Sequence, residues 1–242
     1  MLGVTLNKMR YNLTFSITIL LITLFSFTPL NADDDEKKLT TVQLILSSEL
    51  TIKKLLKNNE IENFDNYISN CRGILIFPDV YEGSFFFGAK GGNGLLLLRK
   101  SKDEFSGPFF YSIGGLSVGL QFGIKSGRVV MAIMTNRGLK SILKERVKFG
   151  VDVDVAVINK GVGYSAESTL RLADIYSFSD NSGLFIGGSL EGSYLQPRND
   201  LNMAMYGKKF SSNEIMQLTK PRKEISDLVK IISNIKNDLP KK

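Results

Sequence analysis

The residues that could carry out a reaction in this chain fall into a few short patterns. Gly115, Ser117 and Gly119 match the G-x-S-x-G arrangement that presents a nucleophilic serine in many hydrolases. That chemistry needs a base to accept the serine proton, and the chain contains no histidine. The pattern also lies within a run that alternates like a strand, whereas a nucleophile elbow joins a strand to a helix. We therefore expect no esterase activity.

Composition narrows the possible chemistry further. A chain without histidine lacks the usual general base and the commonest ligand of zinc, copper and non-haem iron. Its single cysteine, Cys71, excludes internal disulfides and fits a small buried apolar side chain. Asp152 and Asp154 would share one face of a strand and could bind a hard cation, but the solvent side of a half-buried strand explains them more simply. We predict no catalytic residue, no metal and no other cofactor.

A glycine run from Phe87 to Gly94 surrounds one lysine, Lys90. Glycines allow backbone N–H groups to approach an anion, and Lys90 would add a positive charge. The run lacks the G-K-[ST] ending of a phosphate-binding Walker loop, and no helix follows it. A hairpin turn is the favoured interpretation, and Lys90 remains a candidate for binding an anion or a lipid.

The elements that must position these residues begin with helices. Val42, Leu46, Ile52, Leu55 and Leu56 recur near helical spacing and predict one amphipathic helix over 39–57. Its last turn holds three candidate lipid-binding lysines, where cations also suit the helix dipole. These are Lys53, Lys54 and Lys57. Further helices are expected over 61–69, 136–146 and 221–237, and the last should pack back on the domain or lie on a membrane.

Between residues 73 and 207 the apolar residues alternate with a period of two, with frequent glycines, which is typical of strands. Ile74–Phe77 and Leu95–Leu98 are apolar on both faces, which favours a buried soluble core over an outer-membrane barrel. Along Ile113–Ile124, glycines occupy one face and large apolar residues the other, so the bare face marks bends in a curved sheet or receives a flat ligand. We predict an α+β fold with a curved antiparallel, barrel-like core and helices near both termini.

The N-terminal segment and the C-terminal tail carry separate signals. Lys8 and Arg10 precede a charge-free apolar run that ends near Ala32, which predicts a signal peptide over 1–32. A single exported domain with a basic C-terminal helix is then expected over 33–242. Its expected location is periplasmic or secreted. An uncleaved anchor is the alternative.

The formal net charge is +7, and the tail after Gly207 is basic. Its first basic residues form a secondary candidate surface: Lys208, Lys209, Lys220, Arg222 and Lys223. Anionic lipid or plain solvation would explain them, and no nucleic-acid-binding motif is present.

Several motifs, taken in order, resemble the SYLF family of lipid-binding domains over roughly residues 39–207. They are Cys71-Arg72-Gly73-Ile74-Leu75-Ile76-Phe77-Pro78-Asp79-Val80, the Gly88–Gly94 run with Arg99, Phe105-Ser106-Gly107-Pro108-Phe109, Gly114–Gly123, Gly150-Val151-Asp152, Ala173-Asp174-Ile175-Tyr176-Ser177 and Gly183–Gly192. The family usually has tryptophan where Phe105 stands, and its Ala-Gly-Pro-like stretch is replaced here by residues 157–161.

The resemblance implies a binding module without catalysis, as a bacterial exported member of the family. Eukaryotic relatives bind phosphoinositides and other membrane lipids, partly through an N-terminal amphipathic helix, and fungal relatives bind actin. The helix over 39–57 corresponds to that helix. The leading hypothesis is a peripheral protein that recognises anionic phospholipid or phosphoinositide surfaces. The alternative is a structural or protein-interaction module of the cell envelope, with actin as a partner only if the protein is delivered to a host cell.

Overall fold

The computed structural model describes residues 34–59, 61, 63–84, 87–118, 123–158, 173–181, 190, 192–219 and 221–235. The expected signal peptide over 1–32 therefore lies outside the described residues. The helices are α2 (Asp34–Leu56), α3 (Phe64–Asn70), α4 (Asn136–Ile142), α6 (Asn199–Tyr206), α7 (Ser212–Gln217), the short 3-10 helix η2 (Lys223–Ile225) and α8 (Ser226–Asn234). The strands are β1 (Gly73–Ser84), β2 (Phe87–Arg99), β3 (Phe105–Val118), β4 (Gly123–Ile133), β5 (Val147–Lys148), β6 (Val155–Ile158), β7 (Ile175–Ser179) and β8 (Tyr194–Pro197).

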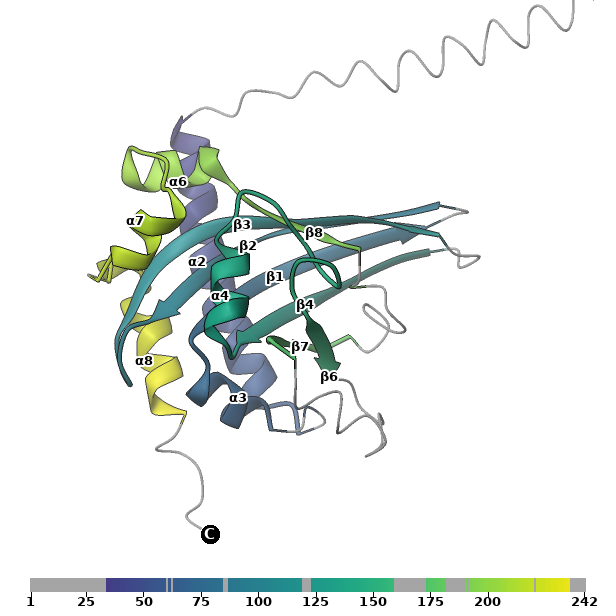
Figure 1. Ribbon diagram of the computed structural model, residues 1–242, viewed down its shortest axis with the longest axis horizontal. Coiled ribbons are helices and arrows are strands. Elements are labelled where there is room, and N and C mark those ends of the chain that lie inside the picture. The colour runs from purple at the N-terminus through teal and green to yellow at the C-terminus, as the bar shows by residue number, and fades with distance from the viewer. Residues whose placement is uncertain are drawn as a thin grey trace, which may run out of the picture. The chain divides into compact units, whose positions relative to one another are not determined.

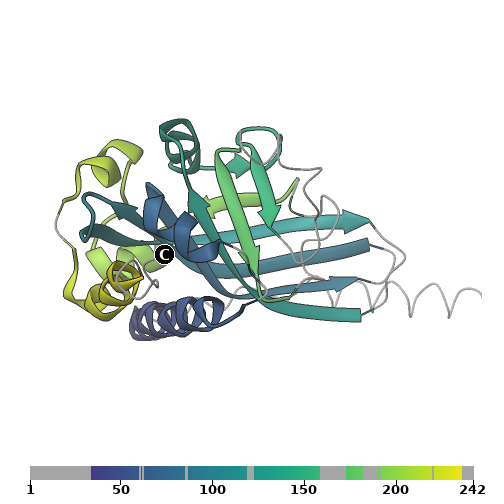
Figure 2. The ribbon, with the colours of Figure 1, turned by 90° about the horizontal axis from the view of Figure 1, so that it is seen from below.

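The strands of the described chain form one eight-stranded sheet in the order β5-β8-β3-β2-β1-β4-β7-β6. Neighbouring strands are antiparallel, except that β6 and β7 are parallel. The four long strands β1 to β4 curl so that the sheet forms a half-barrel (Figures 1 and 2). The predicted α+β fold with a curved antiparallel core and flanking helices is thus confirmed, and the parallel pair is an addition that the sequence did not indicate.

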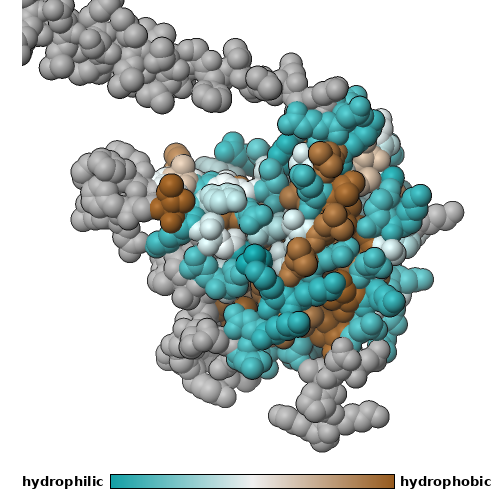
Figure 3. Space-filling view, turned by 180° about the vertical axis from the view of Figure 1, so that it is seen from behind, coloured by the Kyte–Doolittle hydropathy of each residue, from teal (hydrophilic) through white to brown (hydrophobic). Residues whose placement is uncertain are grey.

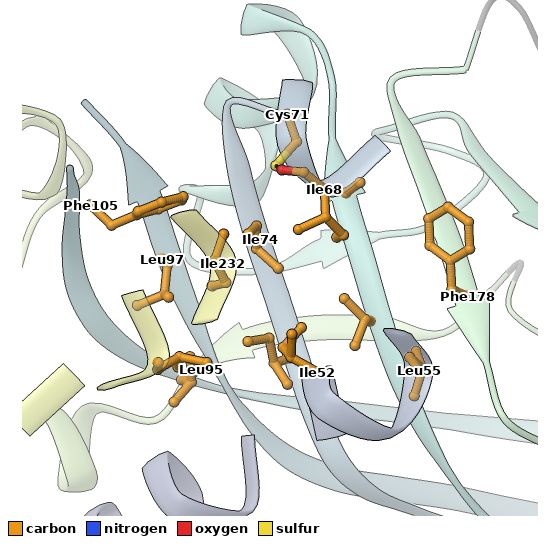
Figure 4. Packing of buried hydrophobic residues seen from close by; sticks show 14 of the residues in the cluster. Ile52, Leu55, Ile68, Cys71, Ile74, Leu95, Leu97, Phe105, Phe178 and Ile232 are labelled. Carbon is orange, nitrogen blue, oxygen red and sulfur yellow. Dashed lines mark hydrogen bonds between the residues drawn. The ribbon is translucent and has the colours of Figure 1, made fainter. Parts of the chain in front are cut away.

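Each face of the sheet holds its own apolar core, because side chains alternate along the strands. Leu75 and Leu96 enter a core that α4 and α7 complete, on what we call the α4 side. Ile74 and Leu95 enter a second core that α2, α3, α6 and α8 complete, on the α2 side. Figure 2 shows α2 and α4 on opposite sides of the sheet, and Figure 4 shows the packing on the α2 side. The expectation that doubly apolar strand runs lie in a buried core is confirmed.

Helix α2 begins at Asp34, five residues before the predicted start. Its first turn holds Asp34, Asp35 and Glu36, whose negative charge stabilises the positive end of the helix dipole. Lys37 and Lys38 each form an ion pair three residues back, with Asp34 at 4.0 Å and Asp35 at 3.4 Å. The apolar periodicity that defined the predicted start therefore begins only after an acidic first turn.

The glycine run does not form the predicted hairpin turn, because it lies inside the continuous strand β2. The physical reason is a bulge in β1, where the register shifts between Ile76 and Asp79. A Cβ atom on Gly92 would lie 2.5 Å from the Asp79 carbonyl oxygen, and one on Gly94 would lie 2.2 Å from that of Ile76. The glycines let two backbones approach closely at the bulge, so they have a role inside a strand.

The other predicted helices are confirmed with shorter bounds. The helix expected over 61–69 is α3, and that over 136–146 is α4, whose N-cap Thr135 accepts a hydrogen bond from the Gly138 N–H. The helix expected over 221–237 is η2 followed by α8. Its residues Leu228 and Ile232 are buried in the core of the α2 side, so this segment packs back on the domain.

Candidate functional site

Helix α2 has an apolar stripe on each of two opposite faces. One face packs against the sheet, α6 and α8, and its large buried residues are Ile45, Ile52 and Leu55. The other carries four large apolar side chains that stay exposed although they recur at helical spacing. They are Leu39 (57% exposed), Val42 (45%), Leu46 (54%) and Leu50 (60%). Figure 3 shows a band of apolar surface on the corresponding face of the molecule. We call these four residues the exposed stripe.

The predicted single stripe of α2 is therefore wrong, because it combined residues from both faces. Val42 and Leu46 are exposed, whereas Ile52 and Leu55 are buried. The buried face also contains Thr41, Ser48 and Thr51, whose hydroxyls donate to backbone carbonyls three or four residues back, at 2.6, 2.6 and 2.8 Å. Hydroxyls that are satisfied by the helix itself can be buried at little cost. A hydropathy pattern does not distinguish this face from the more apolar exposed one.

The two faces of α2 should respond differently to truncation. We expect Ile52→Ala to lower the free energy of unfolding by about 3 kcal/mol, because it leaves a cavity in a fully buried core. Leu46→Ala removes a side chain that is half exposed and should cost less than about 0.5 kcal/mol. Urea unfolding of both variants measures the difference, and equal losses would contradict the assignment of Leu46 to an unpacked face.

The three lysines predicted for lipid binding gather at the C-terminal end of the exposed stripe. Lys53 lies 14 residues after Leu39 and continues the same helical face, and Lys54 lies beside it. Helix α2 ends at Leu56, so Lys57 lies in the turn directly after it and not in the helix as predicted. All three side chains are exposed. The structure thus brings an apolar stripe and a cluster of positive charge together on one surface, while the acidic residues of α2's first turn lie at its other end.

Glu49 is a half-buried acid of α2 that lies one turn before Lys53. Burial and the nearby carboxylate of Asp227 on α8 raise the pKa of Glu49 above its ordinary value, and Lys53 opposes that shift. Because the charged form is disfavoured in the folded protein, Glu49 becomes neutral at a higher pH than an ordinary glutamate. Acidification therefore makes this end of α2 more positive.

Lys90 does not join this surface. It lies on β2, and its side chain points to the α4 side, where it is only 7% exposed. Its Cε atom passes so close to Gly115 that a Cβ there would lie 2.9 Å from it, so the bare glycine face predicted around residue 115 accommodates a lysine side chain. Burial lowers the pKa of Lys90, and the carboxylate of Glu82 opposes that shift.

The secondary basic surface is partly neutralised by neighbouring acids. Lys208 pairs with Glu214 at 2.7 Å, and Arg222 pairs with Glu224 at 2.8 Å. Lys209 and Lys223 are exposed, and Lys220 lies outside the described residues. Lys208 and Arg222 also lie over the rings of Phe210 and Tyr206, which gives both cations a structural role.

The candidate residues for catalysis lie on different elements of the described chain. Ser117 lies within β3, and the next element of the described chain is the strand β4. The prediction that Asp152 and Asp154 share one face of a strand is wrong. The Asp152 carboxylate accepts a hydrogen bond from the Lys148 N–H at 2.7 Å within a turn. Asp154 pairs with Arg137 at 2.9 Å. Cys71 is buried, which raises the pKa of its thiol to about 11. The expectation that Cys71 is a buried apolar residue is confirmed.

Comparison with known proteins gives a consistent set of similarities. The family model described as "Ysc84: Las17-binding protein actin regulator" matches residues 114–235, from β3 to α8, a range that does not include α2. SH3 domain-containing YSC84-like protein 1 of Bos taurus is 28% identical over 171 residues, which cover 69% of this chain and 50% of that protein. The Xenopus laevis protein of the same name is 30% identical over 143 residues, which cover 58% and 42%.

A fungal relative shows the same relation. Protein YSC84 of Saccharomyces cerevisiae is 25% identical over 175 residues, which cover 68% of this chain and 37% of that protein. This chain thus spans about half or less of the length of these relatives. Within the described residues, no helix combines the length and the hydropathy needed to span a bilayer.

Proposed function

Because this chain belongs to the Ysc84 (SYLF) family, we propose that it is a non-catalytic module that binds anionic phospholipid or phosphoinositide membrane surfaces. The observation that carries the proposal is the exposed stripe of α2 with Lys53, Lys54 and Lys57 at its end. An apolar face bordered by lysines is the composition of helices that lie in the membrane interface. Helix α2 can present this face without leaving the domain, because its opposite face remains packed on the sheet.

The expected free energies are sufficient for reversible binding. Fully burying a leucine or valine side chain is worth about 1.5–3 kcal/mol, so four side chains that are half exposed supply roughly 3–6 kcal/mol. Each lysine near an anionic surface adds about 1 kcal/mol. Neither contribution alone gives strong binding after the cost of association is subtracted. The proposed interaction therefore needs both the stripe and the lysines.

Co-sedimentation of the purified protein with vesicles tests the proposal. We expect binding to vesicles that contain phosphatidylglycerol and weaker binding to pure phosphatidylcholine vesicles. High salt should reduce the difference between them, because it screens the lysines over a Debye length of about 3 Å at 1 M. Absence of binding to both kinds of vesicle at low salt would refute the proposed function.

The raised pKa of Glu49 predicts a dependence on pH. At neutral pH, Glu49→Gln should strengthen binding to phosphatidylglycerol vesicles about fivefold, because it removes a negative charge worth about 1 kcal/mol near the surface. As the pH falls through the pKa of Glu49, the unaltered protein should approach the affinity of the variant. This convergence is measured by vesicle titrations of both proteins at intervals of about one pH unit, from about pH 4 to about pH 8. A constant ratio of affinities would contradict it.

We further propose that the segment over 1–32 directs export and that the domain acts in the periplasm or outside the cell. The support is the sequence pattern of two basic residues, an apolar run and Ala32. Mass spectrometry of the protein recovered from cell fractions tests this proposal. A chain that begins at Asp33 is the expected product, and an uncleaved chain in the cytoplasmic fraction would contradict it.

A second candidate function is protein binding, favoured by the description of the matching family model as a Las17-binding actin regulator. In this case the exposed stripe would contact a protein of the cell envelope, or actin if the chain reaches a host cell. Co-sedimentation with actin filaments separates the two candidates. Binding to filaments without binding to vesicles would favour the protein-binding function.

A further inference from the structure

A groove of about 800 Å³ lies between α2 and the sheet. Its volume falls in the range of small-molecule sites, roughly 300–1,000 Å³. One wall is a polar side of α2 that lies between its buried and exposed stripes, and the floor is the α2 side of β1, β2 and β3. The groove is lined by Thr40, Gln43, Leu44, Ser47, Pro78, Asp79, Tyr81, Gly91, Gly92, Asn93, Ser112 and Ile113.

The strand registers arrange the floor in two rows. The first is polar, because Asp79 pairs with Asn93 and Asn93 pairs with Ser112. The second row lies two residues away from the first on each strand and pairs Tyr81 with Gly91. Paired residues lie on the same face of a sheet, so hydrogen-bonding groups border a nearly bare backbone surface with one aromatic ring at its side.

Gly91, in the floor of the groove, is not required by packing. A Cβ atom on Gly91 would have only the Ile113 carbonyl oxygen within 4 Å, at 3.8 Å, which is an ordinary contact. The neighbouring Gly92, by contrast, would bring its Cβ to 2.5 Å from a backbone oxygen. Glycine inside a strand costs stability relative to a residue with a side chain. A strand glycine that the fold could replace, and that keeps the floor of a groove flat, points to a ligand that lies against the backbone.

The chemistry of the lining disfavours an anionic ligand. Among the described residues that line the groove, Asp79 is the only charged side chain, so an anion would meet no compensating cation. Arg198 reaches Asn93, donating to its Oδ1 at 2.6 Å, but its charge is paired with Asp200 at 2.6 Å. This bond fixes the Asn93 amide so that its N–H₂ group is available as a donor beside the acceptor Asp79.

Donors and acceptors of this kind match hydroxyl groups, each of which both donates and accepts. The Tyr81 ring, 56% exposed, offers an apolar surface to the C–H face of a ring-shaped ligand. We infer that the groove binds an uncharged polyhydroxylated ring, either a free saccharide or polyol or the headgroup of a glycolipid. This site is separate from the cationic surface of α2 and does not depend on the proposed binding of anionic lipid.

The test uses two matched substitutions of strand glycines. Gly91→Val fills the floor of the groove. Gly83→Val lies on the same side of the sheet, outside the groove, where a Cβ meets nothing within 4 Å. Because valine favours strands, both variants should unfold at or above the temperature of the unaltered protein. A loss of binding in Gly91→Val alone would therefore not reflect misfolding.

The probes are maltose, methyl β-galactoside, myo-inositol and inorganic phosphate, together with phosphatidylcholine vesicles with and without digalactosyl diacylglycerol. Saturation-transfer NMR and titration calorimetry should show saturable binding of at least one sugar, polyol or glycolipid probe to the unaltered protein and to Gly83→Val, and at least tenfold weaker binding to Gly91→Val. Binding of the glycolipid vesicles alone would identify a headgroup as the source. No saturable binding, equal affinities in both variants, or displacement of the probe by phosphate would overturn the inference.

Discussion

Replacing Lys53, Lys54 and Lys57 together by glutamate is expected to weaken binding to phosphatidylglycerol vesicles by about 100-fold or more. The loss of three attractive charges is worth about 3 kcal/mol, and each introduced carboxylate adds repulsion. All three side chains are exposed, so the fold should be unaffected. The remaining binding should no longer weaken when salt is added, because its apolar part is not screened.

The control for this variant carries the same change in charge on another surface. Lys102, Lys140 and Lys144 are also exposed, the first in the connection between β2 and β3 and the other two in or after α4, on the opposite side of the sheet. Their replacement by glutamate should change vesicle binding much less. Equal losses in the two triple variants would show that net charge, and not the position on α2, governs the interaction.

The second large effect is expected from the exposed stripe itself. Leu46→Asp combined with Leu50→Asp should weaken vesicle binding by roughly 100-fold or more, because it removes two inserting side chains and places two carboxylates at an anionic surface. Both positions are more than half exposed, so the thermal midpoint should change little. Unlike the lysine variant, this one should retain a weak binding that high salt abolishes.

Exposed apolar residues elsewhere provide the comparison. Val151 is 72% exposed and Met216 on α7 is 41% exposed, and neither belongs to α2. The double replacement of these two residues by aspartate should leave vesicle binding within about threefold of the unaltered protein, a difference below 1 kcal/mol. If both double variants lose binding to the same extent, general exposure of apolar surface is responsible and the stripe has no special role.

The fold class could be predicted from the sequence because two of the predicted strands carry a clear pattern of buried residues. Residues 74–77 and 95–98 are apolar on both faces, and the structure places a core on each side of them. The conformation of the glycine run in β2 could not be predicted, because a tight turn and a strand that passes a bulge both favour glycine. Only the spatial pairing of Gly92 and Gly94 with β1 shows which of the two applies.

The candidate surface could be predicted only in part. The three lysines in and just after the last turn of α2 follow from the sequence, since a cluster of cations is visible without a structure. The exposed stripe does not, because Thr41, Ser48 and Thr51 occupy the buried face and make it less apolar than the free one. The groove was missed as well, because its polar row joins three strands whose register the sequence does not specify.

A fluorescent probe on α2 would test most directly whether the exposed stripe enters a membrane. Leu46→Cys can be labelled selectively with an environment-sensitive dye, because Cys71 is buried and the pKa of its thiol is about 11. Addition of phosphatidylglycerol vesicles should shift the emission of the dye at position 46 to the blue, while a dye on Val151→Cys should not change. Vesicle-bound protein whose dye at position 46 keeps its aqueous emission would contradict the account.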